Sequence, residues 1–147
     1  MKNNLIRQIL LMLVFIAYFL VFTGEAKSGE CLSYGPMKVK LAGTIVRKTF
    51  PGPPNYDSIE KGDEPETYWI LKLTKPVCVK GKHDDELNSE TEKGIKNIHL
   101  VLDSGKYARY KHLVSKIVIA EGMLFHAHTG HHRTKVLMEV DSIKPAK

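Results

Sequence analysis

The sequence predicts a mainly β protein, namely a small five-stranded OB-like Greek-key barrel (OB, oligonucleotide/oligosaccharide binding) with one short helix between strands 3 and 4. Three observations support this fold class. Apolar side chains recur mostly at every second residue, which is typical of half-buried strands. Glycines interrupt the first and fourth expected strands, as they do where a strand bends around a small barrel. The order of elements also fits, although a sandwich or an open meander with one helix would produce a similar pattern.

The first two strands follow from alternation and from the breakers around them. The first is expected over 37–48, where every second residue is apolar until Gly43 marks a bulge or sharp bend. The second is expected over 67–73, and it continues loosely past Pro76 to Val79. Because one long, bent strand can pair on both sides, the first strand is expected to serve both halves of the barrel.

A change of period after the third strand predicts the helix. The third strand is expected over 97–102. In the segment 104–115, Tyr107, Tyr110, Lys111 and Val114 recur at intervals of three and four residues. This spacing places them on one side of a helix, and Ser104 is the expected amino-terminal cap.

The last two strands are predicted to form a hairpin. The fourth strand is expected over 116–128, interrupted by Gly122, and the fifth over 134–143. Thr129 and Gly130 lie between them and are residue types that favour turns. The hairpin therefore completes the five strands of the predicted barrel.

The first residues predict export. Lys2 and Arg7 precede an apolar run over 9–22, and small residues follow at Gly24, Ala26 and Ser28. This pattern indicates a signal peptide over 1–26, cleaved after Ala26 or Ser28. A retained membrane anchor is the alternative, but the run is shorter than the roughly 20 residues that span a bilayer. We therefore expect a periplasmic or secreted protein whose residues 27–147 form a single β-barrel domain with no membrane span after cleavage.

The two cysteines are predicted to form a disulfide between Cys31 and Cys78. An oxidising compartment permits this bond, which would tie the amino-terminal segment to the sheet. A redox or metal-binding pair is the alternative, but the C-x-x-C spacing is missing. Lipid attachment at Cys31 is disfavoured because Glu30 occupies a position that requires a small residue.

The charge pattern argues against a nucleic-acid partner. The formal net charge is +6, but the lysines are scattered and alternate with acidic residues. Such interleaving is typical of a solvated surface and not of a stripe that follows phosphates. The expected partner is instead an unknown small ligand or an envelope protein.

Two polar loops are longer than ordinary connections. The segment 50–66, here called the acidic loop, begins with several prolines and then carries five carboxylates against one lysine. The segment 80–96 is a mixed-charge run without periodicity, and we expect a solvated excursion there without chemistry of its own.

The histidine hairpin, residues 126–132, is the strongest candidate site, because four of the seven histidines lie within it. Imidazole is a common ligand for zinc and copper, and alternation predicts that His126 and His128 face the same side of their strand. A carboxylate of the acidic loop could complete a zinc or copper site, and an open position could activate water. The predicted metal ligands are His126, His128, His131 and His132. Solvated turn histidines without a ligand are the alternative.

In a barrel of this class, the loop between the first two strands lies beside the loop between the last two. The acidic loop and the histidine hairpin are therefore expected to form one binding end. Arg133 and Lys135 could instead favour an anion there, such as a phosphate or a sugar acid, more strongly when the histidines are protonated. The predicted ligand-binding residues are Tyr56, Asp63, Glu64, Glu66, Trp69, His128, His131 and Arg133.

Several motifs give the chain a family resemblance. They are Cys31-Leu32-Ser33-Tyr34, Leu41-Ala42-Gly43-Thr44, the segment 49–56 (TFPGPPNY), the segment 62–68 (GDEPETY) and the segment 124–132 (LFHAHTGHH). Through them the chain resembles the bacterial domain-of-unknown-function family 4431 over nearly all of the exported part. The resemblance implies a small exported envelope protein with no established activity. Arg133 departs from it, because a further histidine is expected before Thr134, and this reduces the number of imidazoles available to a metal.

Together these features predict a module that acts by binding rather than by turnover. No serine elbow, phosphate-binding glycine loop or dinucleotide fingerprint is present to indicate an enzyme. Two alternatives stay open. One is a metal-binding protein or metal-dependent hydrolase that uses the histidine cluster, and the other is a structural envelope-interaction protein whose histidines are incidental.

Overall fold

The computed structural model describes residues 30–146, which are mainly β. The strands and helices are β1 (Leu32–Ser33), β2 (Lys38–Pro51), η1 (Ile59–Lys61), β3 (Pro65–Lys80), η2 (Glu86–Asn88), β4 (Glu92–Val101), α2 (Ser104–Tyr110), η3 (Lys111–Leu113), β5 (Ile117–His126) and β6 (Val136–Pro145), where η denotes a 3-10 helix. The described elements belong to one compact unit that begins at Cys31. The predicted signal peptide over 1–26 lies outside the described residues.

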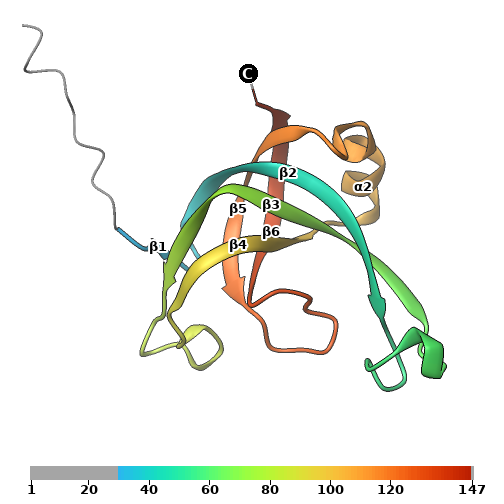
Figure 1. Ribbon diagram of the computed structural model, residues 1–147. Coiled ribbons are helices and arrows are strands. Elements are labelled where there is room, and N and C mark those ends of the chain that lie inside the picture. Colours follow the sequence, from blue (N-terminus) through green and yellow to red (C-terminus); the bar gives the residue numbers. More distant parts are fainter. Residues whose placement is uncertain (1–29, 147) are drawn as a thin grey trace, which may run out of the picture. The chain divides into compact units, whose positions relative to one another are not determined.

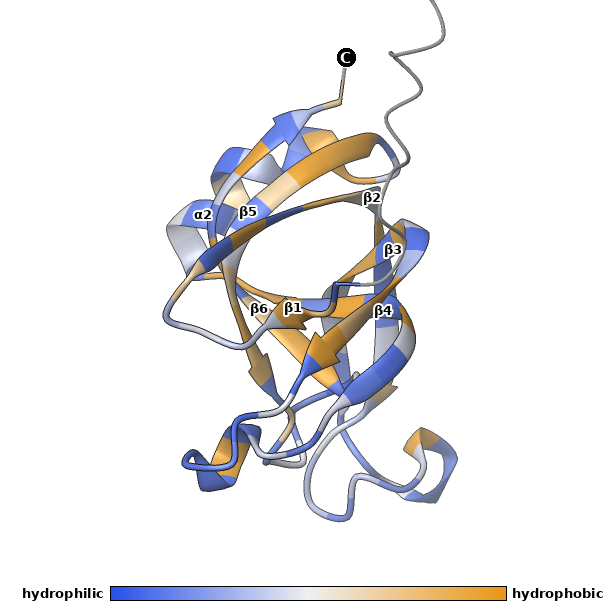
Figure 2. Cartoon of the chain, turned by 90° about the vertical axis from the view of Figure 1, so that its left-hand side faces the viewer, coloured by the Kyte–Doolittle hydropathy of each residue, from blue (hydrophilic) through white to orange (hydrophobic). Residues whose placement is uncertain are grey.

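Five strands close into a barrel, which confirms the predicted fold class (Figures 1 and 2). β2 pairs antiparallel with both β3 and β5, β3 pairs with β4, and β5 pairs with β6. A short parallel pairing between β4 and β6 closes the ring. The helix α2 joins β4 to β5. The sequence predicted the helix after the third strand, but α2 follows the fourth strand of the chain. The additional strand is the two-residue β1, which pairs with the edge of β3 and was not predicted.

Two glycines allow the strands to bend, as the sequence predicts. β2 pairs with β5 through Thr44 and with β3 from Gly43 onward, so the strand changes partners at this point. A Cβ atom on Gly43 would lie 2.9 Å from Cγ of Leu71, so a side chain would crowd β3. On β5, the register against β6 shifts between Glu121 and Gly122, which indicates a bulge.

Strand pairing extends beyond the boundaries expected from sequence. β2 continues to Pro51 and β3 begins at Pro65, so the true loop between them is only 52–64. β3 also runs without a break to Lys80, with register shifts near Val77 that accommodate Pro76. The carboxyl-terminal hairpin differs too, because β5 ends at His126 and not at 128. The residues between the hairpin strands therefore form a loop over 127–135.

The helical segment covers one end of the apolar core. Its amino-terminal cap is Asp103 and not Ser104, because the Asp103 carboxylate accepts a hydrogen bond from the backbone N–H of Lys106 at 2.7 Å. Tyr110 and Leu113 are buried in the core, and the Tyr107 ring packs edge-to-face against Trp69. This helix leads into the start of β5, whereas the histidine hairpin follows its other end (Figure 1). Within residues 30–146, no helix is both long and apolar enough to cross a lipid bilayer.

The predicted disulfide is present between Cys31 and Cys78, with an S–S distance of 2.03 Å. It lies where β1 runs parallel to the end of β3, with Leu32 paired to Val79. Because β1 contributes only two residues to the sheet, the covalent bond adds to the burial of Tyr34 in restraining the start of the domain.

We predict that replacing both cysteines by serine lowers the free energy of unfolding by about 2–4 kcal/mol, because the bond closes a long loop in the unfolded chain. The loop spans a sequence separation of 47 residues. Urea unfolding of the double variant and of the reduced wild-type protein measures the change. Equal midpoints for the oxidised wild type and the double variant would contradict the prediction.

Candidate functional site

Three polar loops gather at the end of the barrel that is distant from α2 (Figures 1 and 2). They are the loop 52–64, the loop 81–91 and the hairpin loop 127–135. The hairpin contacts both of the others: the Tyr56 hydroxyl lies 3.0 Å from Nε2 of His131, and the backbone N–H of His126 donates to Oδ1 of Asn88 at 2.8 Å. The hairpin therefore forms two separate contact regions, one on each side.

The first region is organised around Arg133, and we call it the Arg133 cluster (Phe50, Tyr56, Glu66, Tyr68, His131 and Arg133). The guanidinium donates from Nη2 to Oε2 of Glu66 at 2.7 Å. Three aromatic rings surround it, with their centroids 5.3–5.5 Å from Cζ. Only 7% of the Arg133 side chain is exposed. Cation–π contacts and a charge-assisted hydrogen bond thus compensate for removing this charge from water.

Glu66 is the acceptor that joins the two loops. Besides Arg133, its carboxylate accepts a hydrogen bond from the Tyr68 hydroxyl at 2.7 Å and lies 3.3 Å from Nδ1 of His131. The Tyr68 hydrogen bond lowers the pKa of Glu66 most, and Arg133 and His131 lower it further against the opposing effect of burial. Glu66 is therefore held in its ionised form, and its charge is neutralised by Arg133.

The loop 52–64 is folded around Asp63, which is 3% exposed. Its carboxylate accepts hydrogen bonds from the backbone N–H groups of Asn55, Asp57 and Ser58 at 2.7–2.9 Å. Burial opposes ionisation of Asp63, but these bonds outweigh it and the pKa is lowered. Between them, Tyr56 adopts a left-handed backbone conformation with φ of 59°. Asp63 thus stabilises the loop shape that presents the Tyr56 ring to the hairpin.

Among the predicted ligand-binding residues outside the Arg133 cluster are Trp69 and Glu64. Trp69 is 6% exposed and lies in the core against Tyr107. It is adjacent to Tyr68 in β3, and neighbouring residues of a strand face opposite sides, so only Tyr68 reaches the loops. Glu64 is exposed, and its backbone pairs with Gly52 and Pro53 inside the loop. Trp69 is therefore inaccessible to a ligand at this end.

The four hairpin histidines do not converge on one point. His128 lies beyond the end of β5, so the alternation that predicted a shared face with His126 no longer applies. Its ring instead packs edge-to-face against His132, with centroids 4.5 Å apart, and its backbone N–H donates to Nδ1 of His132 at 3.0 Å. Burial lowers the pKa of His132, and the nearby His128 and His131 add to this effect. His131 belongs to the Arg133 cluster on the other side.

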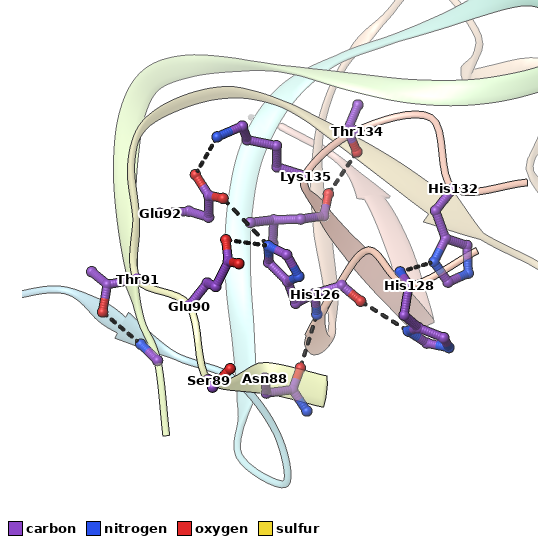
Figure 3. A network of polar contacts seen from close by, with 12 residues as sticks. Asn88, Ser89, Glu90, Thr91, Glu92, His126, His128, His132, Thr134 and Lys135 are labelled. Carbon is purple, nitrogen blue, oxygen red and sulfur yellow. Dashed lines mark hydrogen bonds and ion pairs between the residues drawn. The ribbon is translucent and has the colours of Figure 1, made fainter. Parts of the chain in front are cut away.

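The second contact region brings His126 together with two glutamates that the sequence analysis did not single out. His126 lies 3.3 Å from Glu92 and 3.8 Å from Glu90, measured from Nε2 to the nearest carboxylate oxygens (Figure 3). Lys135 also donates to Glu92, at 3.1 Å. We call Glu90, Glu92 and His126 the acid–histidine cluster. Both glutamates lie in the mixed-charge run 80–96. No periodicity distinguishes them there from solvated residues, so the sequence analysis assigned them no chemistry.

Behind the Arg133 cluster lies the buried histidine His99, which is 4% exposed. Its ring packs against Tyr68 at 4.7 Å, and Nδ1 accepts a hydrogen bond from the backbone N–H of Arg133 at 3.4 Å. Burial lowers the pKa of His99 to about 4, with smaller contributions from His132 and Arg133. The neutral ring is therefore part of the folded structure at neutral pH.

We predict that His99 makes the protein less stable as the pH falls from about 6.5 toward 4, because the unfolded chain binds the proton first. At pH 4, this proton uptake by the unfolded chain lowers the free energy of unfolding by about 3 kcal/mol relative to neutral pH. Urea unfolding of wild type and His99→Gln between pH 7 and 4 tests this, since the variant should lose less stability over the interval. Parallel curves would contradict it.

Comparison with known proteins identifies a family for part of the chain. Residues 97–144 match the family model described as a domain of unknown function, DUF4431. The match includes α2, both strands of the hairpin, all four hairpin histidines and Arg133, whereas Glu66, Glu90 and Glu92 lie before it. No curated protein and no solved structure matches the chain. This match supports a DUF4431 domain in the chain, and the sequence motif 124–132 lies within the matched residues.

Proposed function

We propose that this protein is an exported binding module, and that its binding end is the junction of the acidic loop and the histidine hairpin. The Arg133 cluster carries this proposal, because it holds together side chains from two segments that are far apart in the sequence, 50–68 and 131–133. Fixed aromatic and polar groups at the end of a barrel are the usual setting for ligand recognition. The disulfide supports export, since such bonds persist in oxidising compartments.

The backbone of Tyr56 supports a role in binding. A non-glycine residue with positive φ costs of the order of 1 kcal/mol or more and persists where the surroundings enforce it. Here Asp63 binds the backbone on both sides of Tyr56. Gly130 lies against the Tyr56 ring, where an added Cβ would be 3.5 Å from it. The position of the ring is therefore fixed before any ligand arrives, which reduces the entropy lost on binding.

The chemistry of the junction favours an uncharged ligand with hydroxyl groups, such as a saccharide. Arg133 is buried and paired with Glu66, so neither charge is free to attract an ion. The more exposed groups are the imidazole of His131, with 54% of its side chain accessible, and the tyrosines beside it. Aromatic rings with nearby hydrogen-bonding groups suit sugar rings. The pairing of Arg133 with Glu66 weighs against the phosphate or sugar acid that the sequence suggested.

We predict that chitotriose or cellotriose perturbs the backbone NMR signals of residues 55–58 and 128–133 in the disulfide-bonded protein. Replacing His131 by alanine should weaken this binding at least about tenfold, as expected for a contact residue. The melting temperature should change little, because the hydrogen bonds of His131 are exposed. His112→Ala is the matched control, since His112 is an exposed histidine on η3 at the helical end.

Inorganic phosphate serves as the anion probe in the same titrations. Binding of phosphate but of neither trisaccharide would overturn the saccharide class. Trisaccharide binding with equal affinity in His131→Ala and wild type would overturn the proposed location. If none of the three probes changes the junction signals, the binding proposal fails for these ligands and the structural envelope-interaction alternative is favoured.

A further inference from the structure

We propose that Glu90, Glu92 and His126 bind a divalent transition-metal ion of the zinc type, at a site separate from the Arg133 cluster. One oxygen from each glutamate and one imidazole nitrogen lie within 4.8 Å of one another. Within residues 30–146, this is the one group of three such side chains that meets this distance. The ligand set differs from that predicted from the hairpin, because only His126 is retained.

The separations between the ligand atoms fit a tetrahedral ion. Bonds of about 2.0–2.2 Å from zinc to nitrogen and oxygen place neighbouring ligands about 3.4 Å apart in a tetrahedron. Nε2 of His126 lies 3.3 Å from the Glu92 oxygen and 3.8 Å from the Glu90 oxygen. Glu90 has 72% of its side chain exposed, so a small rotation suffices to complete three ligands. A water molecule would occupy the fourth position.

The scaffold around the cluster is held in place by hydrogen bonds. Glu92 is the first residue of β4 and His126 the last residue of β5, so both lie on strands of the barrel. Asn88 accepts from the backbone N–H of His126 at 2.8 Å (Figure 3). The Asn88 side chain also donates to Asp85 at 2.8 Å. The loop that carries Glu90 is thereby fixed to the end of β5. Such support orients ligands before an ion binds.

A buried tyrosine provides independent support for an ion at this place. Tyr34 is 1% exposed, and its hydroxyl has no hydrogen-bond partner among residues 30–146. Its ring packs edge-to-face with that of His126, with centroids 6.1 Å apart. A metal-bound water would supply the partner that this buried hydroxyl lacks.

Lys135 neutralises the cluster while the ion is absent. Its ammonium group lies 3.1 Å from Oε2 of Glu92, and 71% of its side chain is exposed, so it can move into solvent. An ion that binds Glu92 would displace this ammonium group.

The mixture of nitrogen and oxygen ligands selects the type of ion. Imidazole suits zinc and other first-row transition metals, whereas calcium and magnesium prefer oxygen ligands throughout. Both cysteines are joined in the disulfide, so no thiolate competes for the metal. The acid–histidine cluster thus fits Zn²⁺ better than Ca²⁺ or Mg²⁺.

Isothermal titration of untagged, disulfide-bonded protein with Zn²⁺ after chelator treatment tests the proposal. We expect one Zn²⁺ per chain, a higher melting temperature with Zn²⁺, and no comparable effect of Ca²⁺ or Mg²⁺. Glu90→Gln should weaken Zn²⁺ binding at least about tenfold, and Glu92→Gln should weaken it more. Glu90 is well suited to this test because 72% of its side chain is exposed, so the substitution should leave folding unaffected.

Two matched controls separate this site from others. Glu86→Gln changes an exposed glutamate of the same loop, and His128→Ala changes a hairpin histidine outside the cluster. Both should bind Zn²⁺ as the wild type does. Absence of Zn²⁺ binding, or equal affinity in Glu90→Gln and wild type, would overturn the proposal. Loss of binding in His128→Ala would assign the metal to the hairpin instead. Trisaccharide binding by Glu90→Gln should be unchanged, so failure of one proposal leaves the other testable.

Discussion

The short parallel pairing between β4 and β6 is the constraint on which the arrangement of the loops depends. Only three residue pairs, beginning with His99 opposite Leu137, join the third barrel strand to the last. Because this pairing closes the sheet, the loop that precedes β4 is brought beside the hairpin that precedes β6. An open sheet of the same strands would leave the two apart. Closure therefore explains how Glu92 and His126 become neighbours although 34 residues separate them in the chain.

Arg133 shows how the structure accommodates a buried charge at a loop junction. A guanidinium removed from water is costly unless it is paired, and here Glu66 pairs with it while three aromatic rings surround it. The consequence is a junction that is rigid and nearly neutral. Rigidity would suit binding of a defined ligand, and neutrality is the reason that we propose an uncharged, hydroxyl-rich ligand.

The hairpin separates two regions with different chemistry. On one side, His131 belongs to a neutralised network that includes Arg133 and Glu66. On the other side, His126 faces two carboxylates whose charge is balanced only in part by Lys135. The same sequence cluster of histidines thus supplies one imidazole to a polar junction and another to an acidic one. This division is the physical basis for treating ligand recognition and metal binding as independent properties.

The sequence by itself determined the β class, the order of the elements in the barrel and the bending glycines, because alternation and strand-breaking residues are local patterns. It also determined the disulfide, because two cysteines allow only one pairing within the chain. It also placed the acidic loop beside the hairpin, through the known order of such barrels. Only the tertiary structure decided which side chains meet. Alternation specifies the side of a strand on which a residue lies, but it ends where the strand ends, so His128 could not be placed. Likewise, no local pattern distinguishes Glu90 and Glu92 from solvated glutamates, since only the tertiary structure brings them to His126.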